Sequence, residues 1–339
     1  MNLRQTIAAL LLCSAAFSCH GRSDLNERTE VRAFIDEMVQ QHAFSRSELE
    51  TLFREVELRP DIIETITRPA ESKPWHTYRP IFLTEERIRG GVEFWNEHAA
   101  ILQQAQQRYG VAPQYIVAIL GVETRYGRFR GRHRIMDALA TLAFDYPPRS
   151  TFFRSELQHY LLMTREEAIA PLSLTGSYAG AMGTPQFIPS SFRAYAVDFD
   201  GDGRRDLFNS VPDVIGSVAN YFKVHGWING GTITVPATAA DERHRPLLDA
   251  GFKPHLAAGE LGNYGITPRW NITATAPVAL LALEGEQGPE HWVTFNNFYV
   301  ITRYNRSPLY AMAVHQLSEA IRKARDGRTP LVHTDAALQ

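Results

Sequence analysis

The stretch Gly121-Val-Glu123-Thr-Arg-Tyr-Gly127 places a carboxylate where a helix normally carries hydrocarbon. The residues before it predict a helix with Pro113 in its first turn. Glu123 follows Ile116 and Ile119 at intervals of seven and four residues, so the three side chains share one helix face. The glycine that ends the stretch is expected to close the helix. A carboxyl group among apolar neighbours has a raised pKa, which suits a proton donor near neutral pH.

The same spacing also fits a glutamate at a helix end that forms a salt bridge with Arg125 or Arg128. Spacing alone favours this alternative, because structural ion pairs also perturb carboxyl groups and are common. The choice between the two interpretations depends on the residues that accompany Glu123 elsewhere in the chain.

Composition indicates a globular protein. The chain has 339 residues, of which 44% are hydrophobic and 21% are charged, enough for one large domain or a few small ones. Its formal net charge of -2 gives no electrostatic reason to expect a nucleic acid or an anionic membrane surface as a partner. The 5 Trp and 13 Tyr residues suit stacking on sugar rings, and they are equally ordinary core residues.

The first 18 residues resemble a secretory signal peptide. The apolar run from Ile7 to Phe17 is too short for a bilayer, which needs about 20 such residues. Ser18-Cys19 resembles a lipoprotein processing site, although Ala16 stands where leucine is usual. We expect an exported, periplasmic protein with a lipid anchor at Cys19, in the outer membrane because His20 is no aspartate-type retention signal. Alternatively, the peptide is cut elsewhere and Cys19 is an ordinary apolar residue.

Hydrophobic periodicity predicts a mainly helical α+β chain. Helices are expected at 24–70, with a capping box at Ser47–Glu50, and at Glu85–Glu123, Ile135–Leu142, Phe152–Glu167, Asp213–Val224 (closed by Gly226) and Leu309–Arg325. Three prolines predict a loop around Trp75–Arg79. Strand patterns at Thr232–Val235, Val278–Leu283 and Trp292–Phe295 predict a β-rich insert over residues 231–300.

A second motif, SYAGAMGTPQFIPSS, runs from Ser177 to Ser191. Glycine and proline at this density break a helix and let the backbone approach a ligand closely. Ser177 and Gln186 supply neutral donors and acceptors suited to sugar hydroxyl and amide groups. No GxxxxGK[ST] or GxGxxG signature is present, which disfavours a phosphate cradle. The alternative is a rigid structural loop.

A third motif has the pattern of a calcium-binding loop, with acidic residues at positions 1, 3, 5 and 9 and a glycine at position 6. The candidate ligands are Asp198, Asp200, Asp202, Arg204 and, at the start of the next helix, Asp213. Alternating carboxylates of a turning loop converge on one hard cation, so we expect structural Ca²⁺ and no organic cofactor. Asn209 replaces the bidentate glutamate of position 12. The alternative is a solvated acidic turn with Asp213 capping the helix.

A fourth motif, RYNRSPLY, runs from Arg303 to Tyr310 and leads into the last helix. Asn305 suits a hydrogen bond with a substrate amide, and the tyrosines suit stacking on sugars. Taken alone, the motif is more typical of a turn with core aromatic residues. The metal-hydrolase signature HExxH and the nucleophile elbow GxSxG do not occur, and the 12 histidines are scattered.

In this order, GVETRYG, SYAGAMGTPQFIPSSF, DFDGDG, IGSVANYFKVHGW and RYNRSPLY closely resemble the lytic murein transglycosylase B family, over about residues 28 to 325. The resemblance implies a lysozyme-like helical core with an additional α-helical domain and a small β-rich domain. The expected bounds are a signal peptide at 1–18, an N-terminal helical region at 19–75, the catalytic core with the calcium loop at 76–230, the β-rich insert at 231–300, a C-terminal helical return at 301–325 and a tail at 326–339.

The resemblance also implies an activity. The family cleaves the β-1,4 bond between N-acetylmuramic acid and N-acetylglucosamine of peptidoglycan and leaves 1,6-anhydromuramoyl ends. Glu123 matches the family's catalytic acid/base, and the acidic loop matches a calcium site of EF-hand type. Residues that match the lining of the site are Ser177, Gln186, Tyr221, Tyr304, Asn305 and Tyr310 and, on shorter motifs, Tyr78 and Arg149. The expected partners are peptidoglycan glycan strands and a membrane, through the lipid anchor; the sequence names no protein partner.

This activity agrees with the residues. Most glycosidases pair two carboxylates, whereas the motifs supply one that faces apolar residues. One residue suffices when the substrate provides the nucleophile: Glu123 protonates the leaving oxygen, the acetamido group stabilises the oxocarbenium-like centre, and the C6 hydroxyl closes onto C1. The alternatives are a hydrolytic muramidase, in which Glu123 activates water, and a non-catalytic wall-binding protein.

Overall fold

The computed structural model describes residues 25–68 and 73–327. The predicted signal peptide, the predicted lipid anchor at Cys19 and nearly all of the predicted tail lie outside the described residues. The chain divides into two compact units, Met1–Val56 and Glu57–Gln339. Within the described part of the chain, every helix is too short or too polar to span a bilayer.

The first unit consists of the short 3₁₀ helix η1 (Leu25–Glu27) and the helices α1 (Thr29–His42) and α2 (Arg46–Arg54). All four buried residues of α1, namely Val31, Phe34, Ile35 and Met38, belong to its apolar stripe. The predicted capping box at Ser47–Glu50 is wrong, because Ser45 is the N-cap of α2 and its hydroxyl accepts the backbone N–H of Glu48 at 3.4 Å. Both serines precede a glutamate by three residues, so the sequence pattern alone did not distinguish them.

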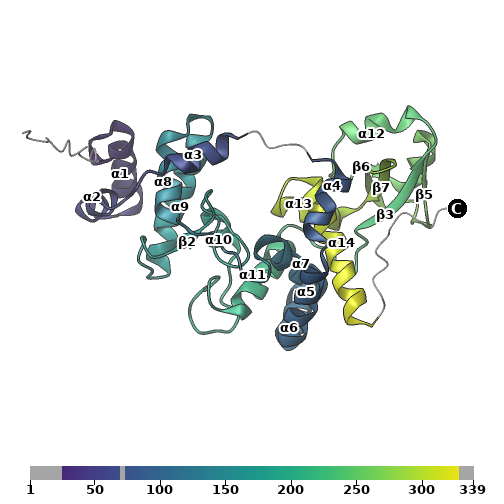
Figure 1. Cartoon of the computed structure of the whole chain (residues 1–339), viewed down its shortest axis with the longest axis horizontal. Coiled ribbons are helices and arrows are strands. Elements are labelled where there is room, and N and C mark those ends of the chain that lie inside the picture. Colours follow the sequence, from purple (N-terminus) through teal and green to yellow (C-terminus); the bar gives the residue numbers. More distant parts are fainter. Residues whose placement is uncertain (1–24, 69–72, 328–339) are drawn as a thin grey trace, which may run out of the picture. The chain divides into compact units, whose positions relative to one another are not determined.

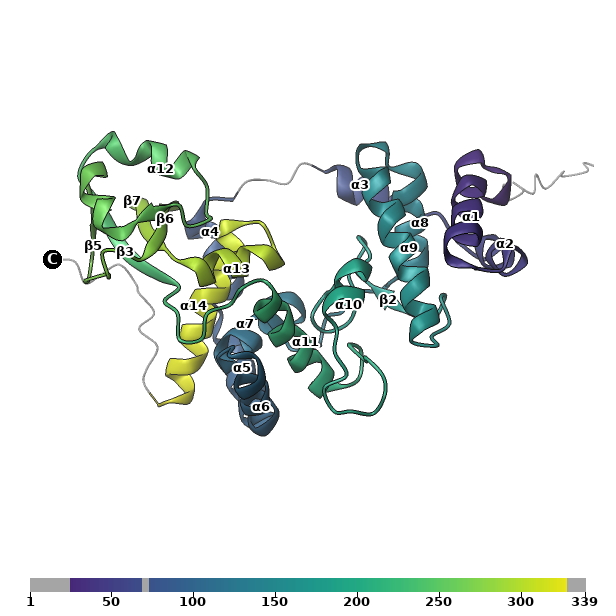
Figure 2. The ribbon, with the colours of Figure 1, turned by 180° about the vertical axis from the view of Figure 1, so that it is seen from behind.

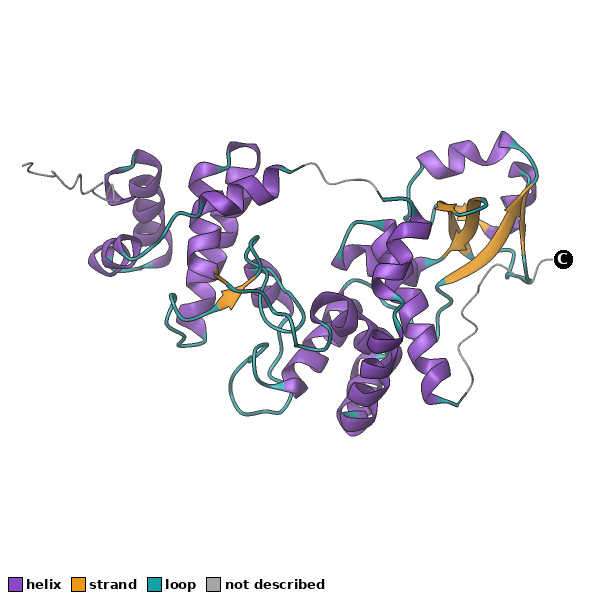
Figure 3. Cartoon of the chain, viewed as in Figure 1, coloured by secondary structure: helices purple, strands orange, loops and turns teal. Residues whose placement is uncertain are grey.

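The second unit is mainly helical, and Figure 3 shows strands only in a short pair and in one sheet. Its helices are α3 (Pro60–Thr67), α4 (Trp75–Phe82), α5 (Glu85–Glu97), α6 (Ala99–Tyr109), α7 (Pro113–Thr124), α8 (Ile135–Asp145), η2 (Pro147–Arg149), α9 (Ser150–Glu166), α10 (Pro189–Tyr195), α11 (Val211–Val224), η3 (Glu242–His244), α12 (Arg245–Asp249), η4 (Ala258–Tyr264), α13 (Asn296–Tyr304) and α14 (Pro308–Arg325). Helix α7 packs against α5, α6, α11 and α14 (Figures 1 and 2). It is apolar on all sides, which is typical of a helix at the centre of a core.

The strands form two antiparallel sheets. Strands β1 (His133–Arg134) and β2 (Thr175–Gly176) form a small pair. The larger sheet has the order β4-β6-β7-β3-β5 and comprises β3 (Thr234–Ala239), β4 (Leu256–Ala257), β5 (Ile266–Pro268), β6 (Pro277–Gly285) and β7 (Gly288–Thr294). Leu247 of α12 packs with Val235, Leu280 and Val293 in the core beside this sheet. The sequence predicted β3, β6 and β7 but not β1, β2, β4 or β5.

Several predicted boundaries are wrong. The expected loop around Trp75–Arg79 is helix α4, which packs against α14 and β6. Burial of the Trp75 side chain outweighs the loss of one backbone donor at Pro80. The expected continuous helix from Glu85 to Glu123 is three helices, and Gly110 in left-handed conformation (φ 74°) ends the second. The last five residues of the expected β-rich insert, 296–300, are the start of α13.

The boundary between the two units lies at Val56–Glu57, ahead of the expected boundary at residue 75. Two side chains of α8 account for this position. The backbone N–H of Glu57 donates to Asp137 and that of Arg59 donates to Thr141, each at 2.9 Å. Because these bonds hold the chain against α8, helix α3 belongs to the second unit.

Candidate active site

Glu123 lies in the last turn of α7, where its carboxyl group is enclosed by protein although part of the residue remains open to solvent. Burial raises the pKa of Glu123 to about 7. The Tyr310 hydroxyl donates to Oε1 of Glu123 at 2.5 Å, and this bond opposes the rise in pKa because it stabilises the ionised form. The carboxyl group is therefore able to hold or release a proton near neutral pH.

The salt-bridged interpretation of Glu123 is wrong. Arg128 instead pairs with Glu86 at 3.7 Å, and the Arg125 guanidinium lies over the Phe129 ring at 5.2 Å. Among the described residues, Glu123 forms no ion pair. Its neighbours are neutral phenols, so its proton affinity is set by burial and hydrogen bonding.

Three tyrosines lie within electrostatic range of the Glu123 carboxyl group, and one of them, Tyr310, is hydrogen-bonded to it. Burial and the charge of Glu123 raise the pKa of Tyr78, Tyr304 and Tyr310, so all three remain neutral donors. They come from α4, α13 and α14. The Tyr304 hydroxyl donates to the carbonyl of Pro185 at 2.6 Å, which fixes this ring against the Gly- and Pro-rich loop. The structure thus brings together four of the residues predicted for the site.

The chain turns sharply directly after Glu123. Helix α7 ends at Thr124, and Arg125, Tyr126 and Gly127 all adopt left-handed backbone conformations (φ 48°, 61° and 87°). The prediction that Gly127 alone closes the helix is therefore wrong by two residues. Left-handed conformations of non-glycine residues cost energy and persist only where the surroundings impose them.

The Thr124 side chain connects this turn to the Gly- and Pro-rich loop. The Thr124 hydroxyl donates to the carbonyl of Thr184 at 2.8 Å and accepts the N–H of Gly127 at 3.0 Å. The Tyr126 hydroxyl donates to the carbonyl of Arg87 at 2.6 Å. Sequence reasoning missed Thr124 and Tyr126 as supports of the site, because only their distant partners reveal these roles.

The two polar residues predicted in the loop also shape its backbone. The Ser177 hydroxyl accepts the N–H groups of Ala179 and Ala181 at 3.3 and 2.9 Å. Gln186 is left-handed (φ 53°), and its Nε2 donates to the carbonyls of Arg130 and Gly183 at 3.2 and 2.9 Å. Ser177 can still donate its hydroxyl hydrogen to a ligand, and Gln186 can still accept a hydrogen bond with its amide oxygen. The end of the motif, expected to be free of helix, begins α10 at Pro189.

The other three predicted residues make contacts away from Glu123. The Tyr221 hydroxyl donates to the carbonyl of Arg303 at 2.5 Å, and its ring lies 4.9 Å from that of Tyr304. The Asn305 side chain accepts the N–H of Ser307 at 3.0 Å in the turn before α14. The Arg149 guanidinium lies 4.4 Å from the centre of the Phe152 ring. The Tyr221 ring therefore packs against the Tyr304 ring, whereas Asn305 and Arg149 are exposed.

The acidic loop gathers three carboxylates. Single oxygens of Asp198, Asp200 and Asp202 all lie within 4.8 Å of one another. Backbone N–H groups, that of Gly203 first, lower the pKa of Asp198, so this group is ionised at neutral pH. Within the described residues, none of the three carboxylates forms an ion pair with a basic side chain. Oxygen-only donors that crowd negative charge fit a hard cation such as Ca²⁺.

The remaining acidic residues hold the loop. Asp213 is fully buried, and its two oxygens accept the N–H groups of Phe199 and Asp206 at 2.7 and 2.8 Å. Burial raises the pKa of Asp213, and the charge of Asp200 adds to this rise. The alternative in which Asp213 caps the helix is wrong, because Ser210 is the N-cap of α11.

Two further residues, Asp206 and Arg204, stabilise the loop. The side chain of Asp206, at the ninth position, accepts the N–H groups of Phe208 and Asn209 at 2.8 and 2.9 Å. Arg204, at the seventh position, donates its backbone N–H to Asp202 at 2.9 Å, which leaves its carbonyl as the group it offers a cation.

Comparison with known proteins places this arrangement in a family. Residues 26–319 match the model of the transglycosylase SLT domain. The chain is 43% identical over 312 residues to the membrane-bound lytic murein transglycosylase B of Escherichia coli (strain K12), which covers 89% of this chain and 85% of that protein.

Solved structures agree with this match. Soluble lytic transglycosylase SltB1 from Pseudomonas aeruginosa has 50% sequence identity and a TM-score of 0.84, covering 88% of this chain and 99% of that one. Lytic transglycosylase Slt35 of Escherichia coli, in complex with calcium, has 42% identity and a TM-score of 0.82, covering 89% of this chain and 96% of that one. Because the family model and these relatives span most of its length, the chain belongs to the transglycosylase SLT domain family and is a lytic transglycosylase.

Proposed function

We propose that this enzyme cleaves the β-1,4 bond between N-acetylmuramic acid and N-acetylglucosamine of peptidoglycan, leaves 1,6-anhydromuramoyl ends, and uses Glu123 as its single acid/base. One observation carries the proposal. Glu123 supplies the one carboxyl group among the predicted catalytic and sugar-binding residues, and the Tyr310 hydroxyl donates to its Oε1 at 2.5 Å. Most glycosidases use two carboxylates, so a single acid/base fits a substrate that supplies its own nucleophile.

The hydrogen bond from Tyr310 indicates which oxygen of Glu123 carries the proton in the proposed mechanism. Oε1 accepts the Tyr310 hydroxyl, so Oε2 carries the proton and donates it to the leaving glycosidic oxygen as the bond to C1 breaks. The acetamido group of the muramic acid stabilises the oxocarbenium-like centre. The C6 hydroxyl oxygen then bonds to C1 while Oε2 takes the hydroxyl proton. Glu123 returns to its protonated form, no water is consumed, and the intramolecular attack benefits from a high effective concentration.

We propose neutral groups as the contacts of the glycan. The hydroxyl hydrogen of Ser177, the amide oxygen of Gln186 and the phenol of Tyr78 suit sugar hydroxyl and acetamido groups. Asn305 and Arg149, which are exposed, are proposed at the margins of the cleft, and Tyr221 acts through Tyr304. We also propose the domain bounds expected from the sequence, except the boundary at residue 75 and the end of the β-rich insert at 296–300.

The test is cleavage of purified murein sacculi by the wild-type enzyme and by Glu123→Gln, followed by mass analysis of the released muropeptides. The wild type should release anhydro ends. Glu123→Gln should lose about a thousandfold in rate, because general acid/base catalysis is worth roughly 10²–10⁴. Reducing ends without anhydro ends would instead show a hydrolytic muramidase. Full activity of Glu123→Gln would exclude Glu123 as the acid/base.

We propose that Asp198, Asp200 and Asp202 hold Ca²⁺, with the carbonyl of Arg204 as a further ligand and Asp213 holding the loop. The convergence of the three carboxylates supports this, as does the calcium seen in Slt35. The ion would neutralise the crowded charge and take no part in bond cleavage.

We also propose an exported enzyme that acts in the periplasm and is anchored to the outer membrane through a lipid on Cys19. The apolar run that ends at Ser18-Cys19 supports this, as does a relative named membrane-bound.

A further inference from the structure

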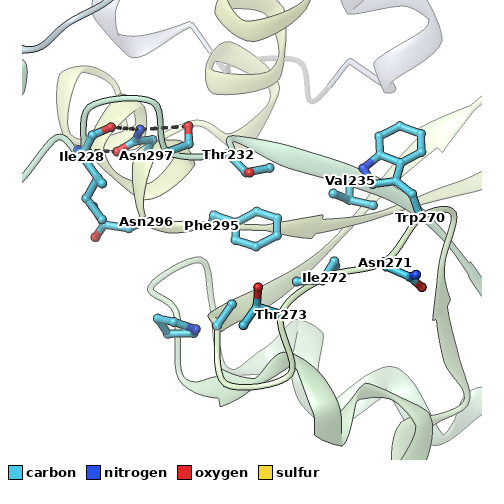
Figure 4. Close-up of a pocket in the computed structure, with 13 residues that line it drawn as sticks. Ile228, Thr232, Val235, Trp270, Asn271, Ile272, Thr273, Phe295, Asn296 and Asn297 are labelled. Carbon is cyan, nitrogen blue, oxygen red and sulfur yellow. Dashed lines mark hydrogen bonds between the residues drawn. The ribbon is translucent and has the colours of Figure 1, made fainter.

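A pocket of about 310 Å³ lies where the five-stranded sheet meets the start of α13 (Figure 4). Segment 228–235 forms one wall and segment 270–277, between β5 and β6, forms another. Figure 4 shows the Phe295 ring between Thr232 on one side and Thr273 on the other. None of the three tyrosines within electrostatic range of Glu123 lines this pocket, so it is distinct from the candidate active site.

The pocket combines an aromatic surface with unused neutral hydrogen-bonding groups. Trp270 at its mouth is 52% exposed, so its indole ring is open to a ligand. Within the described part of the chain, the side chains of Thr232, Asn271 and Thr273 make no hydrogen bond with another residue. By contrast, the Asn297 amide is used internally, in bonds with the backbone of Ile228 and Gly231.

The uncharged lining restricts the class of ligand. No lining residue is acidic or basic, so a phosphate, an ammonium group or a peptide carboxylate would lose hydration without gaining a partner. A purely hydrocarbon ligand would leave the hydroxyl and amide groups of the walls unused. An N-acetylated sugar matches both features, since one ring face is apolar and its hydroxyl and acetamido groups are neutral.

Helix α13 links the pocket to the candidate active site. Asn296, its first residue, lines the pocket, and Tyr304, its last, donates to the carbonyl of Pro185 in the Gly- and Pro-rich loop of the candidate active site. A helix of nine residues spans about 12 Å between its end residues. A glycan strand needs only a few sugar rings to reach from one site toward the other.

We propose that this pocket, with Trp270 as a stacking platform, binds an N-acetylated sugar of the glycan strand outside the segment held at Glu123. The inference rests on the proposed function, because it assumes a glycan substrate. Two contacts on one strand raise the apparent affinity through effective concentration, so the pocket favours long strands over short fragments.

The test measures binding without turnover. Glu123→Gln and the double variant Glu123→Gln/Trp270→Ala are titrated with purified glycan strands from which the peptides have been removed, and with a tetrasaccharide of the same sugars. Loss of Trp270 should weaken binding of long strands by roughly fivefold, the size of one aromatic contact, and leave the tetrasaccharide unchanged. Glu123→Gln/Trp270→Phe, which keeps a ring, should retain most of the affinity. Thermal unfolding of all variants shows that the fold is intact.

Unchanged binding of long strands by the Trp270→Ala double variant would overturn the inference. An equal loss for long and short ligands would also overturn it, because the residue would then act on the catalytic cleft. These outcomes do not depend on whether the wild-type enzyme makes anhydro ends, so failure of the proposed function would be seen separately.

Discussion

At the scale of single residues, the chemistry of Glu123 results from two opposing influences on one carboxyl group. Enclosure by protein raises its pKa, and the hydrogen bond from Tyr310 lowers it. The result, about 7, leaves both protonation states populated near neutral pH. A group that must first donate a proton and then accept one works best under this condition.

Replacement of Tyr310 by phenylalanine tests this balance. Without the hydroxyl donor, the ionised form of Glu123 loses the hydrogen bond from Tyr310, so its pKa rises further. The first step needs the protonated form, so the rate falls as pH rises through the pKa. This fall should move to higher pH in Tyr310→Phe, with a rate about tenfold lower at neutral pH because the weaker acid donates its proton less readily to the leaving oxygen.

The control is Tyr221→Phe, whose hydroxyl donates to Arg303 and not to Glu123. Its pH–rate profile should keep its midpoint even if its rate falls. A Tyr310→Phe enzyme that is slower with an unshifted midpoint would show that Tyr310 acts only by packing.

The raised pKa of Glu123 was predictable from the sequence, but the contacts that surround its carboxyl group were not. The spacing argument placed its side chain on the face of Ile116 and Ile119, whereas Val117 and Leu120 on other faces are equally buried. Its partner Tyr310 lies 187 residues further along the chain. No local pattern encodes such a contact, so only the ordered motifs of a family pointed to it.

At the scale of elements, the turn after α7 is the most constrained part of the site. Two non-glycine residues, Arg125 and Tyr126, are held left-handed there. The Tyr126 side chain folds back along α7, where Gly121 leaves room for it. A methyl group on Gly121 would lie 2.6 Å from the Tyr126 hydroxyl, closer than van der Waals contact allows.

Gly121→Ala should therefore disturb the turn. The ring of Tyr126 must move away from its bond with Arg87, so the free energy of unfolding should fall by about 1–3 kcal/mol, as in other overpacked sites. The rate of sacculus cleavage should fall by at least about tenfold, because the position of Glu123 depends on this turn. Chemical denaturation and muropeptide release measure the two effects.

Gly262→Ala is the matched control. A methyl group there meets no atom within 4 Å, so both stability and rate should stay near the wild-type values. Equal behaviour of the two variants would show that the packing of Tyr126 on Gly121 does not hold the turn.

Elements with long periodic patterns were predictable, and short ones fixed by distant contacts were not. The buried stripe of α1 and the segments of α9 and α14 follow their sequence patterns closely. Helix α4 does not, since its prolines predict a loop and its helix depends on packing against α14 and β6. That error mattered, because α4 carries Tyr78 into the site.

At the scale of the whole chain, the site is built from segments far apart in sequence. Its acid lies on α7 and its tyrosines on α4, α13 and α14, while the sheet is inserted between α11 and α13. The mainly helical, lysozyme-like fold expected from the motifs is confirmed by the likeness to Slt35. Periodicity alone yielded most of the long helices and the strands β3, β6 and β7, but not which helices meet.

A cation bound at the acidic loop should stabilise more of the chain than the loop itself. Asp213 ties both arms of the loop to α11, and α11 packs against α6, α7 and α10. A cation that relieves the repulsion among Asp198, Asp200 and Asp202 therefore stabilises the helical core as well as the loop. At a calcium concentration of about one hundred times the dissociation constant, the gain should be about 2.7 kcal/mol, seen as a higher Tm that a chelator reverses.

Two variants distinguish calcium binding at the loop from a general effect of net charge on Tm. Asp202→Asn keeps an oxygen that can accept the Arg204 N–H but removes one ligand charge, so most of the calcium-dependent rise in Tm should disappear. Asp249→Asn removes the same charge at the exposed end of α12 and should keep the full rise. If both variants retain it, or if magnesium gives the wild type an equal rise, the three carboxylates are not a calcium site, since Mg²⁺ keeps its waters and rarely uses such a protein cage.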